Sequence, residues 1–358
     1  MTAKKKWKVG ILGLGHWYSA YGLARLLPEY PGAELVAVAA SDSPHLDSFA
    51  QTFRVPAYDD PAALLEREDI DIVQISGRVS EVPGLTLQAA RAGKHIILGK
   101  PMAMTLAQAD EMVEVVRGSG VTCVPFQAIM RLRLFDLKQR IARGEIGEIA
   151  VMHQTGRWSI AEDWPGSGTP GWFVDPEHVP GGALIDEGIY WMDLLRWFSD
   201  SEVVRVEART ANLVHKELRV EDWGMAMLEF ANGIRATVEG SWTINAPRKT
   251  GPSPKHNSVV RLEVVGTRGE VFEQFFRDPG RAVLAAGASD WVYERQARDL
   301  FQSEIPMPLG HLIDCLEQGR SPIADIMEAR QSFAVALAAY QAAREGRSVS
   351  LVDGRVSG

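Results

Sequence analysis

WKVGILGLGHWY, residues 7–18, is an apolar run that leads directly into two glycines separated by one residue. Gly13 and Gly15 lack Cβ atoms, so the chain can turn tightly there and its backbone can come close to a ligand. A strand, such a turn and a helix form the opening of a dinucleotide-binding unit, in which the pyrophosphate lies at the helix N-terminus. Tyr18 replaces the third small residue of the fingerprint, and a tight turn without a ligand is the alternative.

Apolar runs of the same kind, rich in Val and Ile, recur through the first 125 residues, at 33–41, 71–76, 95–100 and 121–126. Runs that are apolar throughout are typical of strands buried on both faces of a parallel sheet. Helical patterns lie between them, and two have recognisable starts: Asp60 before Pro61, and a capping box from Thr105 to Gln108. The alternation predicts a doubly wound, Rossmann-type α/β domain over residues 1–125.

The pattern changes over residues 126–358, which we expect to form an α+β domain. MAMLEFANGIRATVEGSW (225–242) predicts two strands around Asn232-Gly233, a strong hairpin signal, and residues 261–275 predict a second hairpin. Together they indicate an open, mainly antiparallel sheet with one face covered by helices. Residues 245–258 hold three prolines and are expected to form an exposed loop. Helical patterns cover residues 131–143, 183–198, 309–318 and 325–345, and a further strand is expected over 149–158.

Composition excludes several classes of function. The chain has 358 residues, 46% of them hydrophobic and 23% charged, which fits a globular protein of two domains. A net charge of −8 argues against general affinity for nucleic acid, with Lys4-Lys5-Lys6 as the local exception. Cys123 and Cys315 fit neither a disulfide framework nor a metal site, so a reducing cytoplasm is the expected compartment. No apolar run approaches the length of a membrane span.

The end of the second predicted strand bears on the choice between NAD and NADP. An NAD site usually has an acid at this tip that binds the ribose, but residues 39–42 place Asp42 slightly late. No arginine is adjacent to bind a 2′-phosphate, and Asp42 would repel one, so NAD is slightly favoured over NADP. The residues expected to contact the cofactor are Gly13, Gly15, His16, Trp17, Ser41, Asp42, Ser76, Lys100 and Gln127.

The segment GGALIDEGIYWMDLLRW (181–197) predicts a helix with three polar residues on one face. Asp186, Tyr190 and Asp193 are spaced i, i+4 and i+7, so they share a stripe. The stripe is either a solvent-exposed surface or one side of a site. Lys100 follows the fourth predicted strand, where open α/β sheets bind their ligands; a surface lysine before a turn is the alternative.

Three segments resemble the glucose–fructose oxidoreductase/inositol dehydrogenase family (Gfo/Idh/MocA). AGKHIILGKPMAMTLAQADEMVE (92–114) resembles its "AGKHV…EKP" segment, residues 181–197 its "GGG…D.G.H..D" segment, and residues 313–351 its closing helices. The resemblance spans nearly the whole chain and implies a Rossmann domain followed by an open-sheet domain, residues 126–358, for substrate binding and oligomerisation. It also implies a nicotinamide cofactor, a sugar, cyclitol or related polyol as substrate, and a homodimer or homotetramer.

Carried over by position, the resemblance implies that Lys100, Asp186 and Tyr190 are catalytic. Lys100 matches the lysine of "EKP" and Asp186 the site aspartate. Tyr190 stands where most members have a catalytic histidine, as in a tyrosine-containing branch of the family. The chain departs from the family pattern at Gly99, at residues 76–79 in place of "T-P-N", and at Pro180.

Hydride transfer from a carbinol needs a base for the hydroxyl proton. Tyr190 is the candidate: its pKa would normally be about 10, but a nearby Lys100 ammonium would favour the phenolate. Asp186 could hold the substrate hydroxyl or the lysine, and Asp193 is expected to have a structural hydrogen-bonding role.

Tryptophans gather just before this helix, in a polar loop. Aromatic faces beside hydrogen-bonding groups suit carbohydrate, although packing in the core is the alternative for each tryptophan. No histidine spacing indicates a metal site. The residues expected to contact substrate are Arg157, Trp158, Trp164, Trp172 and His178.

Three functions remain open at this point. The first is an NAD(P)-dependent dehydrogenase or reductase. The second is a glycoside-cleaving enzyme that oxidises a ring carbon and reduces it back, with no net change of NAD. The third is a non-catalytic nucleotide sensor, which would not need Lys100, Asp186 and Tyr190.

Overall fold

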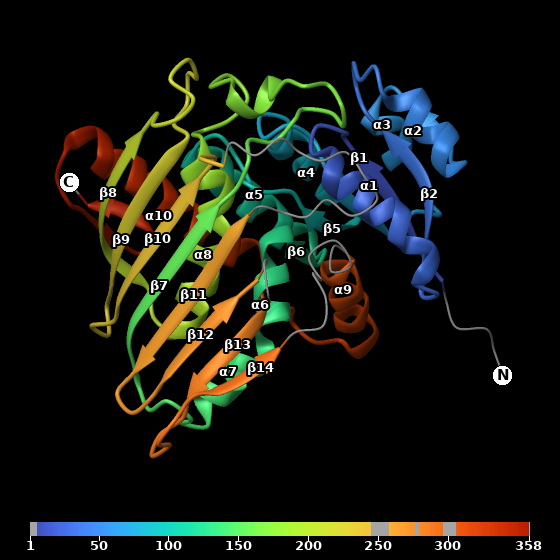
Figure 1. Ribbon diagram of the computed structural model, residues 1–358. Helices are drawn as coiled ribbons and strands as arrows, with labels where there is room; N and C mark the ends of the chain where they lie inside the picture. Colours follow the sequence, from blue (N-terminus) through green and yellow to red (C-terminus); the bar gives the residue numbers. More distant parts are fainter. Residues whose placement is uncertain (1–5, 245–257, 276–278, 296–305, 358) are drawn as a thin grey trace.

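The computed structural model describes residues 6–244, 258–275, 279–295 and 306–357, and contains two sheets with helices packed between them (Figure 1). The first sheet has six parallel strands in the order β3-β2-β1-β4-β5-β6. This is the doubly wound order, and it reverses between β1 and β4. The strands are β1 (Trp7–Leu12), β2 (Ala33–Ala39), β3 (Ala57–Tyr58), β4 (Ile72–Ile75), β5 (His95–Leu98) and β6 (Cys123–Pro125).

The five apolar runs predicted as strands are confirmed. In β1, for example, the residues from Val9 to Leu12 are buried. Strand β3 is an addition, because two residues at a sheet edge leave no periodic signal. Lys100 therefore follows the fifth strand of the chain and not the fourth. The Asp60 side chain caps the following helix at Ala62, and Thr105 forms the expected capping box with Gln108. The helices are α1 (Trp17–Leu26), α2 (Leu46–Phe53), α3 (Pro61–Leu65), α4 (Val82–Arg91) and α5 (Leu106–Ser119).

The second sheet has ten strands in the order β14-β13-β12-β11-β7-β10-β9-β8-β15-β16. Among the described strands, β7 and β10 form its one parallel pair, and all other neighbours are antiparallel. Both predicted hairpins are confirmed, as β9–β10 and β11–β12. Most of the predicted loop 245–258 lies outside the described residues. The strands are β7 (Ile149–Arg157), β8 (Val203–Ala211), β9 (Trp223–Phe230), β10 (Arg235–Ser241), β11 (Val259–Gly266), β12 (Glu270–Gln274), β13 (Gly280–Leu284), β14 (Val292–Arg295), β15 (Val349–Val352) and β16 (Arg355–Ser357).

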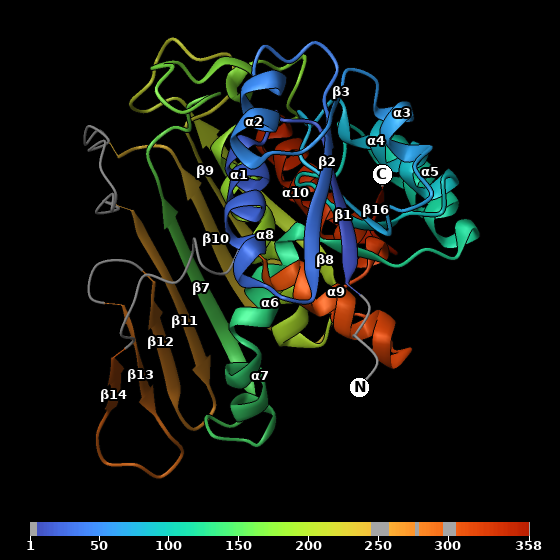
Figure 2. The same ribbon diagram turned by 90° about the vertical axis from the view of Figure 1, so that its right-hand side faces the viewer.

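One face of the second sheet is covered by helices that lie between it and the first sheet, as Figure 2 shows. The two long ones are α8 (Ala183–Ser199), against β10, and α10 (Ile326–Glu345), against β8 and α8. Along β9 the side chains alternate, so that Ala226 and Leu228 are buried while Met225 and Met227 are exposed. The expected fold class, a Rossmann domain plus an open, mainly antiparallel sheet, is confirmed. The shorter helices are α6 (Ile129–Arg133), α7 (Phe135–Ala142) and α9 (Met307–Gln318).

Two buried polar clusters fix the position of α8. At its N-terminus, the Glu221 carboxylate accepts hydrogen bonds from the backbone N–H groups of Gly182 (2.9 Å) and Leu184 (3.0 Å) and from the Tyr340 hydroxyl (2.6 Å). A carboxylate there satisfies unpaired helix donors and complements the helix dipole. Further along, Asp193 accepts hydrogen bonds from Arg131 Nε (2.7 Å) and from a serine hydroxyl of α10 (3.0 Å). The structural role expected for Asp193 is confirmed.

Across the described parts of the chain, none of the helices is both long and apolar enough to cross a membrane.

Candidate active site

The turn after β1 packs directly against the turn after β4. Gly13 has φ +83°, and a Cβ on it would lie 2.5 Å from Gly77 Cα. A Cβ on Gly15 would lie 2.5 Å from the backbone nitrogen of Arg78. Real Cβ atoms do not come so close to backbone, so both positions require glycine. The two turns thus meet at the point where the strand order reverses, which is where doubly wound sheets bind dinucleotides.

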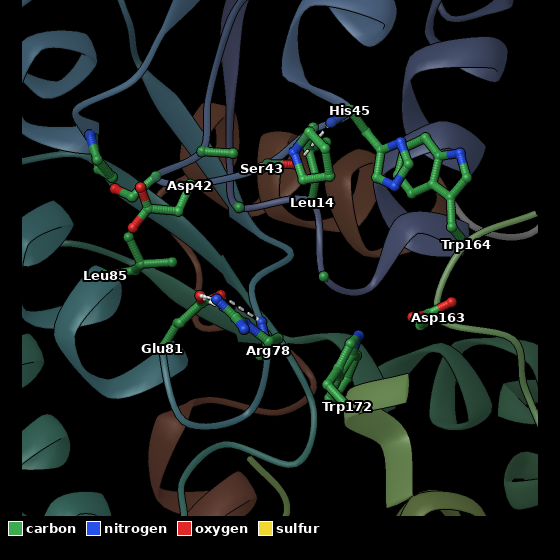
Figure 3. A pocket seen from close by; sticks show the side chains of 16 residues that line it. Leu14, Asp42, Ser43, His45, Arg78, Glu81, Leu85, Asp163, Trp164 and Trp172 are labelled. Carbon is green, nitrogen blue, oxygen red and sulfur yellow. Dashed lines mark hydrogen bonds and ion pairs between the residues drawn. The ribbon is translucent and has the colours of Figure 1, made fainter. Parts of the chain in front are cut away.

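A cavity of about 260 Å³ opens beside these turns and is drawn in Figure 3. It lies at the carboxyl ends of the strands of the first sheet, and its wall has no Cβ atoms at Gly13 and Gly15 to keep a phosphate away from the backbone, so the residues fit a dinucleotide. Of the residues expected to contact the cofactor, Gly13, Gly15, Ser41 and Asp42 line it. The other lining residues are Leu14, Ala40, Ser43, Pro44, His45, Pro61, Arg78, Glu81, Leu85, Asp163, Trp164 and Trp172.

The aromatic loop 159–180 extends from the second sheet over this cavity. The Trp164 ring stacks on the His45 ring with 3.5 Å between centroids and 3° between planes. Trp17 at the start of α1 donates its indole hydrogen bond to the carbonyl of Glu162 in the same loop, over 2.9 Å. The structure therefore places Trp164 at the β2 end of the cofactor cavity (Figure 3). It is not beside Trp158 at the end of β7, with which sequence reasoning grouped it.

Lys100 and Asp186 form a buried ion pair between the two halves of the molecule. The Lys100 ammonium donates to the Asp186 carboxylate over 2.5 Å and to the Asp186 backbone carbonyl over 2.8 Å. The two side chains are 5% and 14% exposed, so solvent screens this pair little. Burial alone would lower the pKa of Lys100, but the negative charge of Asp186 and the neighbouring tyrosines raise that pKa well above its usual value. Lys100 therefore stays charged in the site.

Two tyrosines flank the Lys100 ammonium. Its nitrogen lies 5.0 Å from the centre of the Tyr190 ring and 6.0 Å from the centre of the Tyr18 ring. Burial raises the pKa of both phenols, that of Tyr18 to about 12, while the Lys100 charge acts in the opposite direction on each. Sequence reasoning missed Tyr18 as a site residue. The available signal was a large polar side chain at a fingerprint position that normally holds a small residue.

The solvent-exposed alternative for the stripe on α8 is wrong. Asp193 is fully buried and Tyr190 is 7% exposed, while the Asp186 side chain contacts Lys100. The helix turns this face inward because its N-terminus is fixed by Glu221 and its middle by Arg131.

A second, much smaller cavity of about 10 Å³ lies next to Asp186. His16 and Trp172 line it with Pro101 and Ile185. The Trp172 ring stacks on Phe173 at 3.9 Å between centroids and meets the edge of the His16 ring at 4.8 Å. Trp172 also lines the cofactor cavity, so its ring separates the two spaces. The remaining lining residues are Val79, Phe173, Val179, Pro180 and Gly181.

Other residues expected at the site line neither cavity. Arg157 at the end of β7 pairs with Glu239 over 3.2 Å, and His178 is within 2.9 Å of the Ser80 hydroxyl. Ser76 is fully buried and hydrogen-bonds the Ser19 hydroxyl over 2.9 Å. Gln127 is 1% exposed in a short 3-10 helix after β6, and the Trp158 backbone donates to the Ser241 carbonyl. Within the described ranges no group of three or more potential ligands could hold a metal ion.

Comparison with known proteins identifies the family. Residues 7–126 match the family described as "Oxidoreductase family, NAD-binding Rossmann fold", and residues 135–272 match the "GFO/IDH/MocA C-terminal domain". The chain belongs to the GFO/IDH/MocA family. The resemblance inferred from its motifs is confirmed, and with it an NAD-binding Rossmann fold and an oxidoreductase activity.

Several members of the family are similar over nearly the full length of the chain. The scyllo-inositol 2-dehydrogenase (NAD(+)) of Bacillus subtilis is 27% identical over 96% of each chain. The D-apiose dehydrogenase of Paraburkholderia graminis is 28% identical over 98% of this chain and 91% of its own. Among solved structures, levoglucosan dehydrogenase in complex with NADH and L-sorbose superposes with a TM-score of 0.83 at 20% identity, covering 97% of this chain and 99% of the other. At that identity the structural likeness shows the fold.

Proposed function

We propose that this protein transfers a hydride between NAD and a hydroxyl or carbonyl group of a sugar, cyclitol or related polyol. The observation that carries the proposal is the buried Lys100–Asp186 pair flanked by two phenols, next to a dinucleotide-sized cavity. Relatives named as dehydrogenases of scyllo-inositol and D-apiose support the substrate class. Tyr190, at the position where most members of the family have a histidine, supports the assignment of the chain to a tyrosine-containing branch.

In the proposed mechanism, Lys100 and Asp186 orient the reacting hydroxyl. An ammonium has three N–H donors, and Asp186 accepts two of them through its carboxylate and its carbonyl. The third is shared with the Tyr18 hydroxyl, and a substrate oxygen that replaced this phenol as the acceptor would have its negative charge stabilised as its proton leaves. Because Asp186 holds the ammonium from the α8 side, the donor is fixed before substrate binds.

Tyr190 exchanges the hydroxyl proton. When the alcohol is oxidised, the phenolate of Tyr190 takes this proton, and in the reverse direction the phenol returns it. Burial raises the pKa of Tyr190 well above its usual value, and the Lys100 charge acts against that rise, so the lysine is the group that stabilises the phenolate as the proton is exchanged. The nicotinamide ring of bound NAD supplies the hydride acceptor. His16, Trp17, Lys100 and Gln127 remain proposed cofactor contacts, and Arg157, Trp158, Trp164, Trp172 and His178 proposed substrate contacts.

The charges around the larger cavity favour NAD over NADP. Asp42 at the end of β2 and Asp163 in the aromatic loop both line it. Arg78 is the positive group in the lining, and Glu81 neutralises it through an ion pair of 2.8 Å. A 2′-phosphate would therefore meet more negative than positive charge.

We further propose that residues 1–125 bind the dinucleotide and residues 126–358 bind substrate and mediate assembly. Met225 and Met227 are exposed on the helix-free face of the second sheet, which suits a homodimer or homotetramer formed through that face. The two cysteines are buried and free, as suits a cytoplasmic protein.

The test is an absorbance assay of NADH or NADPH formation with a panel of sugars, cyclitols and sugar acids. Growth of the NADH signal with one class of polyol, abolished in Lys100→Met, would support the proposal. Cleavage of aryl glycosides without net NADH would favour the redox-neutral alternative. Cofactor binding without any reaction, unchanged in Lys100→Met, would favour a sensor.

A further inference from the structure

Two residues that line the small cavity beside Asp186 each carry a buried polar nitrogen. These nitrogens are His16 Nε2 and Trp172 Nε1, and no described residue forms a hydrogen bond with either. His16 is 3% exposed, and its ring touches the Trp172 ring edge to face. An unsatisfied buried polar atom destabilises a protein by roughly 1–3 kcal/mol, so two at one cavity indicate that something binds there.

The chemistry of each nitrogen follows from its surroundings. His16 Nδ1 lies 3.0 Å from the Gly77 carbonyl, which can only accept a hydrogen bond, so Nδ1 carries the proton. Burial and then the Lys100 charge lower the pKa of His16 to about 4, so the ring is neutral near neutral pH and Nε2 is a pure acceptor. The indole Nε1 of Trp172 can only donate. The cavity thus presents one acceptor and one donor.

A hydroxyl group matches this pair because it donates one hydrogen bond and accepts others. The cavity volume of about 10 Å³ fits a single oxygen atom rather than a larger polar group. Asp186, which holds the Lys100 ammonium, lines the same cavity. A hydroxyl in the cavity would therefore be a close neighbour of the hydroxyl that Lys100 orients.

We propose that His16 and Trp172 form a specificity subsite for a second hydroxyl of the substrate, on the carbon next to the one that is oxidised. That hydroxyl donates to His16 Nε2 and accepts from Trp172 Nε1. The inference rests on the proposed function, and narrows the substrate class to vicinal diols within a sugar or cyclitol. His16 orients this hydroxyl and takes no proton from it, because its lowered pKa disfavours the protonated ring.

Two substitutions test the subsite by removing one hydrogen-bonding atom each. His16→Asn keeps an amide N–H for the Gly77 carbonyl but lacks the Nε2 acceptor, and Trp172→Phe keeps an aromatic ring but lacks the donor. Two control variants carry the same substitutions away from the cavity. His153→Asn lies on the exposed face of the second sheet, where His153 contacts Thr237. Trp197→Phe lies where the Trp197 ring stacks on Phe135.

The measured quantities are kcat/KM for the best polyol of the panel and for its analogue that lacks the neighbouring hydroxyl. We expect each test variant to lose roughly 10- to 100-fold in kcat/KM for the polyol and little for the deoxy analogue. Both substrates are compared at saturating NAD, because His16 is also a proposed cofactor contact and Trp172 lines the cofactor cavity, and both controls should behave as wild type. Equal losses for polyol and deoxy analogue would overturn the proposal.

A second readout does not depend on turnover. In protein labelled with 15N-histidine, the His16 Nε2 resonance, assigned by its loss in His16→Asn, is followed as NADH and then the polyol are added. A shift on adding the polyol, and not before, supports the subsite. A shift with NADH alone would assign the cavity to the nicotinamide carboxamide, and no shift at all would mean that it holds a buried water; either overturns the proposal. If no polyol yields NADH in the wild type, it is the proposed function that fails.

Discussion

The Lys100 ammonium lies 2.5 Å from the Asp186 carboxylate, and these two residues come from different halves of the molecule. Lys100 follows β5 of the first sheet, and Asp186 is in the first turn of α8, which packs on the second. Neither side chain can do its proposed work alone, because the ammonium is oriented only when the carboxylate and carbonyl of Asp186 accept its protons. The proposed active site thus depends on the contact between the two halves of the molecule.

Replacing Lys100 with methionine should lower kcat by ~10²-fold or more, since the oxygen that loses its proton would have no charged donor. The change also leaves Asp186 as an unpaired buried carboxylate, so the free energy of unfolding should fall by roughly 3–5 kcal/mol. Steady-state kinetics and urea unfolding measure the two effects. Lys216→Met, at an exposed loop lysine, is the control and should change neither. Full activity in Lys100→Met would remove the lysine from the mechanism.

Tyr190→Phe should lower turnover by ~10²-fold while leaving the Kd for NADH nearly unchanged, because it deletes the proposed proton acceptor. Stopped-flow measurement of hydride transfer and NADH fluorescence separate the two quantities. Unchanged turnover would exclude Tyr190 as the base.

Tyr18→Phe should shift the pH dependence of kcat/KM for alcohol oxidation to lower pH. The negative charge of an ionised Tyr18 would raise the pKa of Tyr190, and the neutral Tyr18 hydroxyl takes a hydrogen bond from Lys100, so removing this hydroxyl should let Tyr190 ionise at lower pH. The rise of kcat/KM for alcohol oxidation should then occur at lower pH than in the wild type. A shift toward higher pH would contradict the placement of Tyr18 beside Tyr190 and Lys100.

Gly13→Ala should weaken NADH binding by about tenfold or more and destabilise the fold. At φ +83° an alanine is strained by at least ~1 kcal/mol, and its Cβ would lie 2.5 Å from Gly77 Cα, which is backbone and cannot move aside. Gly84→Ala is the matched control, because a Cβ at this position in α4 meets no atom within 4 Å. That variant should gain ~0.5–1 kcal/mol of stability with unchanged NADH binding. Equal NADH affinity and equal stability of the two variants would show that the turn after β1 does not require glycine.

Asp42→Asn should raise the affinity for NADP relative to NAD by roughly threefold to tenfold. The carboxylate lines the cofactor cavity at the end of β2, and its removal relieves repulsion of a 2′-phosphate. Asparagine also tolerates the left-handed backbone at this residue, φ 52°. Fluorescence titrations at low and high salt measure the ratio, and the gain should shrink as salt increases. A gain that is equal for both cofactors would mean that Asp42 does not face the 2′ position.

His16 makes stability depend on pH in the acid range. Burial lowers its pKa from 6.5 to about 4 in the folded protein, so the unfolded chain binds the proton more readily between these values. The contribution of neutral His16 to the free energy of unfolding is therefore present above about pH 6.5 and is lost as the pH falls toward 4. The loss amounts to roughly 3 kcal/mol. The difference in unfolding free energy between wild type and His16→Gln, measured by urea denaturation at several pH values, isolates this residue. A difference that grows on acidification would contradict the buried, neutral ring.

Features with a local cause could be predicted from the sequence. The β1 strand, the glycine turn, the Thr105 capping box and the Asn232-Gly233 hairpin depend on residues next to one another, and all of them are present in the structure. Asp186, Tyr190 and Asp193 could be grouped because helical periodicity places them on one face. Whether this face points to solvent or into the protein could not be predicted from periodicity, because it depends on Glu221 and Arg131, which are distant in the sequence.

The features that escaped prediction depend on tertiary contacts. The approach of Tyr18 to Lys100 needs β1 and β5 to be placed in one sheet, and the stacking of Trp164 on His45 needs the aromatic loop to cross from one sheet to the other. Strands β13 to β16 at the sheet edges are short, and the pairing that defines them leaves only a weak local pattern. Tyrosine and tryptophan side chains are long enough to act far from their own strand or helix, so their position along the chain is a poor guide to the site that they join.

The packing of α10 has a consequence for how the protein is made. This helix, near the end of the chain, lies against α5 and β6 of the first sheet, and Arg330 pairs with Asp110 over 2.7 Å. Helix α9 packs against β5 and β6 as well. A nascent chain that has emerged only through residue 125 thus contains all six strands of the nucleotide half but leaves the surface that α9 and α10 cover open to water. During translation that surface is a natural target for chaperones, and a transcript truncated shortly before α9 should yield a product that is degraded rather than a smaller nucleotide-binding protein.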